Sequence, residues 1–193
     1  MIKAVFLDRD GVINPLVYNP MTGEYESPHH PEDVSVYPYV IESLRTIIGL
    51  DYKLFLISNQ PSYAKGKTTL ENIQDIHTQL DKYFKYNGIE FLGYFYCYHH
   101  PQGIVPGYSG ECDCRKPKPG FLCKAKADFI IDMSASWLIG DQDTDIQCAQ
   151  SQGLRTVLIQ NKYSAHKRGS SNPDFLANNL QEAVQILKNN YNA

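Results

Sequence analysis

The chain has 193 residues, of which 42% are hydrophobic and 20% are charged, a composition typical of soluble globular proteins. Its formal net charge of −3 disfavours a nucleic-acid-binding surface, and no apolar run reaches the roughly 18 residues of a membrane-spanning helix. We therefore expect one domain over residues 1–193, a monomer, and neither a nucleic-acid nor a membrane partner. The N-terminus is a short apolar run ended by charges, unlike a signal peptide, which predicts a cytoplasmic protein.

Short apolar runs alternate with helix-length segments along the whole chain. The predicted strands lie at 3–8, 53–59, 91–98, 136–141 and 155–160, and the predicted helices at 38–50, 69–88, 120–130, 144–153 and 180–190. This repeated order predicts an α/β fold with a mainly parallel central sheet and helices on both faces. Residues 14–37 form a Pro- and Tyr-rich insertion without clear periodicity, and loops of that length are often functional lids.

Polar side chains follow several predicted strands at the point where each strand ends, and one lysine precedes a predicted helix. Ligands of open parallel sheets bind at the carboxyl ends of the strands, so we expect these side chains to meet at one edge. In chain order they are Asp8, Asp10, Ser58, Asn59, Gln60, Lys116, Asp141 and Asp145.

These residue types indicate phosphoryl chemistry. Asp8 and Asp10 are two residues apart, so an extended chain points both carboxylates to one side, which is costly unless a cation lies between them. Oxygen ligands with spare water positions suit Mg²⁺, and Asp141 is the expected second carboxylate. A carboxylate can also attack phosphorus to form an aspartyl-phosphate, while Ser58 and Lys116 hold the phosphoryl oxygens.

Each motif taken alone has a simpler explanation. DxDG could be a turn that uses Gly11, SNQ could be an ordinary strand end, and GDxxxD could be a helix N-terminus with favourable acids. Lys116 alone would be a solvated surface charge. Their joint occurrence at strand ends favours a site over coincidence.

The ordered set of motifs resembles the haloacid dehalogenase (HAD) superfamily of phosphatases, and within it the heptose bisphosphate phosphatases and their relatives, the histidinol-phosphate phosphatases. The resemblance implies a Rossmann-like HAD fold of three layers and a phosphoric monoester hydrolase. It is carried by FLDRDGVIN (6–14), SNQPSYAKG (58–66), YCYHHPQG (96–103), CDCRKPKPG (112–120) and IDMSASWLIGD (131–141).

The resemblance also implies roles for individual residues. Asp8 matches the nucleophile, and Asp10 matches the general acid and base. Asp8, the backbone carbonyl of Asp10 and Asp141 match the Mg²⁺ ligands. Ser58 and Lys116 match the positions that hold the phosphoryl group. The substrate-binding positions are Asn59, Gln60 and Arg115.

A second predicted metal site lies in a loop at about 97–114. Three sulfurs and one imidazole suit a closed tetrahedral Zn²⁺ site, and the resemblance supports zinc although the one-residue gaps are tighter than usual. Four protein ligands leave no open position, so we expect a structural zinc that sets Arg115 and Lys116 in place. The predicted ligands are Cys97, His99, Cys112 and Cys114.

Twelve residues separate His99 from Cys112, which resembles the longer loop of the heptose bisphosphate phosphatases. The implied reaction removes the 7-phosphate of D-glycero-D-manno-heptose 1,7-bisphosphate in nucleotide-heptose biosynthesis for lipopolysaccharide, capsule or S-layer glycan. The alternatives are a histidinol-phosphate phosphatase, another small sugar-phosphate phosphatase, or a zinc-organised binding module without catalysis. A binding module without catalysis would be expected to lack at least one of Asp8, Asp10, Lys116 and Asp141, and all four residues are present.

Overall fold

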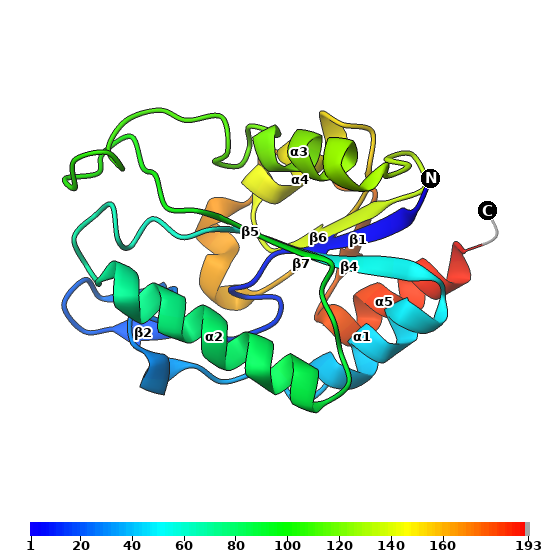
Figure 1. The fold of residues 1–193 in the computed structure, drawn as a ribbon, viewed down its shortest axis with the longest axis horizontal. Helices are drawn as coiled ribbons and strands as arrows, with labels where there is room; N and C mark the ends of the chain where they lie inside the picture. Colours follow the sequence, from blue (N-terminus) through cyan, green and yellow to red (C-terminus); the bar gives the residue numbers. More distant parts are fainter. Residues whose placement is uncertain (192–193) are drawn as a thin grey trace.

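The centre of the molecule is a six-stranded sheet whose strand pairs are all parallel (Figure 1). This computed structural model describes residues 1–191 and has the strand order β5-β4-β1-β6-β7-β8. The order confirms the predicted α/β fold, but the sequence prediction missed β8, since three residues carry too short a pattern. The strands are β1 (Lys3–Leu7), β4 (Tyr52–Asn59), β5 (Gly93–Cys97), β6 (Trp137–Gly140), β7 (Arg155–Ile159) and β8 (Phe175–Ala177).

Helices cover both faces of the sheet, as predicted, and form the outer two of three layers (Figure 1). Side chains alternate along β1, so that Val5 and Leu7 belong to one apolar core and Ala4 and Phe6 to the other. Within residues 1–191 no helix has the length and apolar character needed to cross a bilayer. The first core packs against α1 (Val40–Gly49), α2 (Leu70–Tyr86) and α5 (Leu180–Asn189), and the second against α3 (Gly120–Phe129) and α4 (Asp143–Gln150).

β1 lies between β4 and β6, so three strand ends meet at one place on the carboxyl edge. Leu7 is paired with Leu56 on one side and Ile139 on the other. The chain then turns sharply at Gly11, whose φ is 89°, a conformation that glycine adopts without strain. A Cβ atom at Gly11 would lie 2.2 Å from an Asp141 oxygen, so the turn also needs glycine to bring Asp141 close.

The insertion at 14–37 is more regular than the sequence predicted. It contains an antiparallel hairpin of β2 (Val17–Asn19) and β3 (Glu24–Glu26), followed by a short 3-10 turn, η1 (Pro31–Asp33). The periodic signal was absent because each strand has only three residues. Glu26 forms an ion pair with Lys67 at 2.6 Å, and Tyr25 stacks on Tyr163 with ring centroids 3.7 Å apart. These contacts fix the hairpin beside the carboxyl edge of the sheet.

Candidate active site

A cavity of about 300 Å³ opens at the carboxyl ends of β1 and β4. Many of the predicted site residues line it, although they come from separate parts of the chain. Asp8 and Asp10 follow β1, Asn59 ends β4, and Arg115 and Lys116 precede α3. The sheet topology therefore brings these residues together as predicted.

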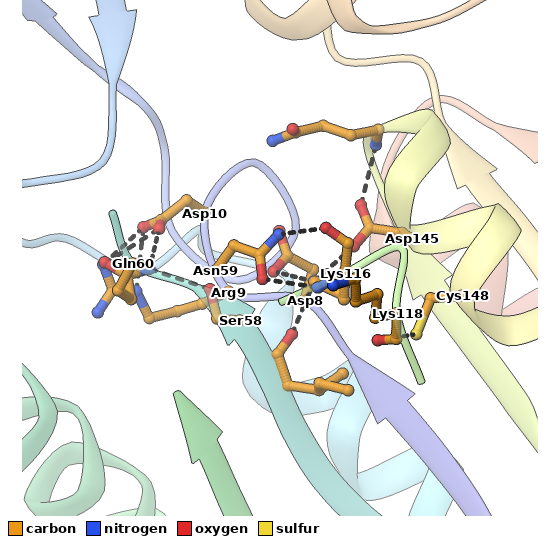
Figure 2. Close-up of polar contacts among 12 residues, drawn as sticks. Asp8, Arg9, Asp10, Ser58, Asn59, Gln60, Lys116, Lys118, Asp145 and Cys148 are labelled. Atoms are coloured by element: carbon orange, nitrogen blue, oxygen red, sulfur yellow. Dashed lines mark hydrogen bonds and ion pairs between the residues drawn. The ribbon is translucent and has the colours of Figure 1, made fainter. Parts of the chain in front are cut away.

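Lys116 is the central cation of the cavity. Its Nζ donates to Asp8 Oδ1 at 2.8 Å and to the Ile57 carbonyl at 2.9 Å, and it lies 2.5 Å from Asp145 Oδ1 (Figure 2). Burial acts to lower the pKa of Lys116, but the carboxylates of Asp145 and Asp8 outweigh it and raise that pKa. Lys116 is thus a fixed, buried positive charge, and not a solvated surface lysine.

Asp8, Asp141 and Asp145 form a cluster in which one oxygen of each lies within 4.8 Å of the others. Burial raises the pKa of Asp8 to about 6, against the attraction of Lys116 and with a further contribution from Asp145 and Asp10. Burial, and then the charges of Asp8 and Asp145, raise the pKa of Asp141 well above its usual range. The carboxylates therefore repel one another at this place.

The cluster fits a Mg²⁺ ion. Both side-chain oxygens of Asp141 are buried and have no hydrogen-bond partner among residues 1–191. Leaving two such oxygens unpaired is costly in a folded protein. The three side chains of the cluster offer carboxylate oxygens, and oxygen atoms are the ligands that Mg²⁺ prefers. A cation here would bind the unpaired Asp141 oxygens and would offset the repulsion among the three carboxylates.

Asp145 is a residue of this cluster that the predicted ligand set left out. It is the third helical residue of α4, where its side chain accepts a hydrogen bond from the Gln142 backbone at 3.0 Å as part of a capping box. The same carboxylate pairs with Lys116 through its other oxygen. Asp145 is the second acid of the GDxxxD pattern. A helix cap accounts for an acid at that position, so the pattern alone did not predict its contact with Lys116.

Asn59 holds the backbone of Lys116, and Arg115 contacts the loop that contains His99. Asn59 donates from Nδ2 to the Lys116 carbonyl at 3.1 Å and accepts from the Lys116 backbone at 3.0 Å. Arg115 donates to the His99 carbonyl at 3.3 Å, which connects the cavity to the cysteine loop. Substrate binding by Asn59 and Arg115 stays a prediction, and both line the cavity that a substrate would enter.

Asp10 accepts hydrogen bonds from several buried neighbours, which include Arg9 and Gln60 (Figure 2). Burial alone would raise the pKa of Asp10, but the charge of Arg9 and the hydrogen bonds from Asn14 and Gln60 outweigh it and hold that pKa below its usual value. Ser58 Oγ accepts from Gln60 Nε2 at 2.9 Å. Ser58 and Gln60 are almost fully buried and are not among the lining side chains, and their predicted roles stay predictions.

The second predicted metal site is also assembled. The three sulfurs lie 3.2, 3.4 and 3.6 Å apart, and His99 Nδ1 lies 3.6 and 3.9 Å from two of them. Two sulfurs bound to one tetrahedral zinc by Zn–S bonds of about 2.3 Å would be about 3.8 Å apart, so the donor set fits zinc. All four residues, Cys97, His99, Cys112 and Cys114, form one cluster without a disulfide.

Comparisons with known proteins indicate the family to which the chain belongs. The family described as HAD-hydrolase-like matches residues 113–183. A D-glycero-beta-D-manno-heptose-1,7-bisphosphate 7-phosphatase from Yersinia pestis is 30% identical over 98% of this chain and 97% of its own length. The protein of the same name from Vibrio cholerae is 36% identical over 81% of this chain and 80% of its own.

A solved structure supports the same fold. The D,D-heptose 1,7-bisphosphate phosphatase from B. bronchiseptica, crystallised with magnesium and phosphate, superposes with a TM-score of 0.79 at 23% identity, covering 98% of this chain and 99% of that one. The chain belongs to the HAD-like hydrolases and is a phosphoric monoester hydrolase. Its curated relatives within that family carry the name of a heptose-1,7-bisphosphate 7-phosphatase.

Proposed function

We propose that this enzyme is a Mg²⁺-dependent phosphatase that removes the 7-phosphate of D-glycero-D-manno-heptose 1,7-bisphosphate through an aspartyl-phosphate on Asp8. The names of the relatives support this substrate. The observation that carries the proposal is the cavity itself, which combines the Asp8–Lys116 pair with further cationic side chains. The product, a heptose 1-phosphate, would serve nucleotide-heptose biosynthesis.

The proposed Mg²⁺ ligands are Asp8, the backbone carbonyl of Asp10, and Asp141. When bound, the ion would neutralise charge on the phosphoryl group as it is transferred. Lys116 would hold a second phosphoryl oxygen, because its Nζ already lies 2.8 Å from Asp8 Oδ1. Ser58, behind the lining at the end of β4, is proposed to donate to a third oxygen.

The chemical steps follow from these positions. An oxygen of Asp8 attacks phosphorus, the bond between phosphorus and the sugar oxygen breaks, and Asp10 donates a proton to that leaving oxygen. Water then attacks the aspartyl-phosphate while Asp10 takes up its proton, which releases inorganic phosphate and restores Asp8. Lys116 remains protonated throughout, since two carboxylates stabilise its charge.

The rest of the cavity suits a second phosphate. Lys65, Arg115 and Lys167 line it, and none of the three pairs with a carboxylate in the described part of the chain. Burial, and then repulsion from Lys67 and Arg115, lower the pKa of Lys65, as expected of crowded cations that lack an anion. A distal phosphate would relieve this repulsion, and Arg115 can bind its oxygens bidentately.

The zinc site is proposed to be structural. Four protein ligands leave no open coordination position, and Arg115 and Lys116 directly follow Cys114 in the chain. The same loop also supplies His100 to the cavity lining. The bound metal would therefore fix one wall of the cavity without taking part in the reaction.

Replacing Arg115 by alanine tests the distal-phosphate contact. We expect the preference in kcat/KM for the bisphosphate over the heptose 7-phosphate to shrink by tenfold or more, about 1.4 kcal/mol, because remote binding energy is lost. Hydrolysis of 4-nitrophenyl phosphate should change little. Arg45→Ala, on an exposed position of α1, is the matched control. An unchanged bisphosphate preference would remove Arg115 from this role.

The substrate proposal is tested by comparing kcat/KM for the heptose bisphosphate, histidinol phosphate and simple hexose phosphates. We expect the bisphosphate to be preferred by tenfold or more. If histidinol phosphate or a hexose phosphate is better by the same factor, the heptose proposal fails while the phosphatase assignment stands. The cytoplasmic location, the monomeric state and the single domain stay predictions, and cell fractionation, gel filtration and limited proteolysis would test them.

A further inference from the structure

Arg9 is fully buried and directly follows the proposed nucleophile Asp8, yet it has no role in the reaction steps proposed above. Its guanidinium donates from Nε to Asp10 Oδ1 at 3.0 Å and from Nη2 to Asp10 Oδ2 at 3.1 Å. Its central carbon lies 5.9 Å from the centre of the Tyr96 ring, whose hydroxyl is 3.2 Å from His77 Nδ1. Burying a guanidinium is costly, so its fixed pairing with Asp10 calls for an explanation.

Gln60 completes the contacts around Asp10. Its Nε2 donates to Asp10 Oδ2 at 2.5 Å and to Ser58 Oγ at 2.9 Å, while its Oε1 accepts from Arg9 Nη2 at 2.8 Å. Only one orientation of the amide satisfies this arrangement, because a flip would turn its oxygen toward the carboxylate and its NH₂ toward the guanidinium. An amide is therefore the group that this position requires.

Asp10 is held through both of its oxygens. Oδ1 accepts from Arg9 and from Asn14 Nδ2 at 2.8 Å, and Oδ2 accepts from Arg9 and Gln60. Four donors occupy about as many acceptor positions as a carboxylate offers. The acid form of Asp10 has fewer acceptor positions, so it must release one donor. Gln60 can do so while keeping its bond to Ser58, whereas Arg9 spans both oxygens.

We propose that Arg9 and Gln60 are positioning residues that orient Asp10 for proton transfer to the leaving oxygen. In that step the bond between phosphorus and the leaving oxygen breaks, its electron pair stays on the oxygen, and the Asp10 proton moves there. Gln60 also links Asp10 to Ser58, so the acid and the proposed phosphoryl-holding hydroxyl are set together. This inference rests on the proposed role of Asp10 as the acid.

The test measures kcat/KM for a series of phosphate esters, from 4-nitrophenyl phosphate through phenyl phosphate to the best sugar phosphate. This parameter reports steps only up to the transfer to Asp8, where a good leaving group needs little protonation. For Gln60→Leu we expect a loss of about 10- to 100-fold with the sugar phosphate and about threefold or less with 4-nitrophenyl phosphate. Arg9→Met should give the same unequal loss.

Two further variants keep the test decisive. Gln60→Glu retains the size of the side chain and an acceptor for Arg9, but it loses the donor to Asp10. The same comparison of esters can therefore be made with Gln60→Glu if Gln60→Leu does not fold. Gln185→Leu, on an exposed position of α5, is the matched control. Equal loss with all esters would mean a merely structural role and would overturn the inference.

Asp10→Asn is measured in parallel to separate the two possible failures. If Asp10→Asn shows the unequal loss and the Gln60 and Arg9 variants do not, the positioning inference is wrong and the proposed mechanism stands. If Asp10→Asn itself slows all esters equally, the acid role of Asp10 fails, and the inference fails with it.

Discussion

The Asp8→Asn variant is expected to lose at least a thousandfold in kcat while keeping its fold. An amide cannot attack phosphorus, and each factor of ten corresponds to about 1.36 kcal/mol of barrier, so the loss is about 4 kcal/mol or more. The fold should survive because the asparagine oxygen can still accept from Lys116 Nζ, which now lies 2.8 Å from Asp8 Oδ1. Removing the charge of Asp8 also relieves its repulsion with Asp141 and Asp145.

The measurement is phosphate release from 4-nitrophenyl phosphate, together with a thermal melt of the same preparation. Asp75→Asn is the matched control, since it makes the same chemical change at an exposed position of α2. A purified Asp8→Asn protein that retains more than a few per cent of the wild-type rate would exclude Asp8 as the nucleophile. A large fall in Tm with the loss of activity would instead indicate that Asp8 is needed for folding.

The Cys114→Ser variant is expected to lose bound zinc, thermal stability and activity together. The metal would connect Cys97 with Cys112, which are 15 residues apart, and closing a loop of that length is worth about 3 kcal/mol in the related case of a disulfide. At about 2–4 °C per kcal/mol for a chain of this size, Tm should fall by on the order of 10 °C. Activity should fall because Arg115 and Lys116 directly follow the lost ligand.

Metal analysis, melting curves and phosphate release would be measured on one preparation of each variant. Cys123→Ser is the matched control, because Cys123 is exposed on α3, outside the cysteine and histidine cluster, and its Sγ donates a hydrogen bond to Gln152. Equal zinc content in Cys114→Ser and wild type would contradict the ligand assignment. Freshly purified wild-type protein without zinc would contradict the metal assignment itself.

The sequence predicted the main sheet and the meeting of the site residues for one physical reason. Buried parallel strands are nearly continuous apolar runs, and their polar ends must meet at the carboxyl edge. Asp8, Asn59 and Lys116 could therefore be placed together before any contact was known. β8 and the β2–β3 hairpin were not predicted, because strands of three residues are too short to show a periodic pattern of apolar residues.

The contacts of Arg9 and Asp145 could not be predicted from the sequence. Arg9 lies between Asp8 and Asp10 in the chain, where an arginine is equally compatible with an exposed turn, and only the fold shows that it is fully buried against Asp10. Asp145 caps the start of α4, and this local role was sufficient to explain an acid there. Its ion pair with Lys116 across the cavity could not be predicted from the pattern. Local patterns thus predict which groups are present at an edge, whereas packing decides which of them touch.

The most direct test of the proposed reaction follows purified enzyme and D-glycero-D-manno-heptose 1,7-bisphosphate by phosphorus NMR in the presence of Mg²⁺. We expect the resonance of the 7-phosphate to disappear as inorganic phosphate appears, while the resonance of the 1-phosphate remains. The reaction should stop at that product, because we propose that the distal phosphate binds to the cavity-lining Lys65, Arg115 and Lys167 and not beside Asp8. Loss of the 1-phosphate, or no release of phosphate from this compound, would contradict the proposal.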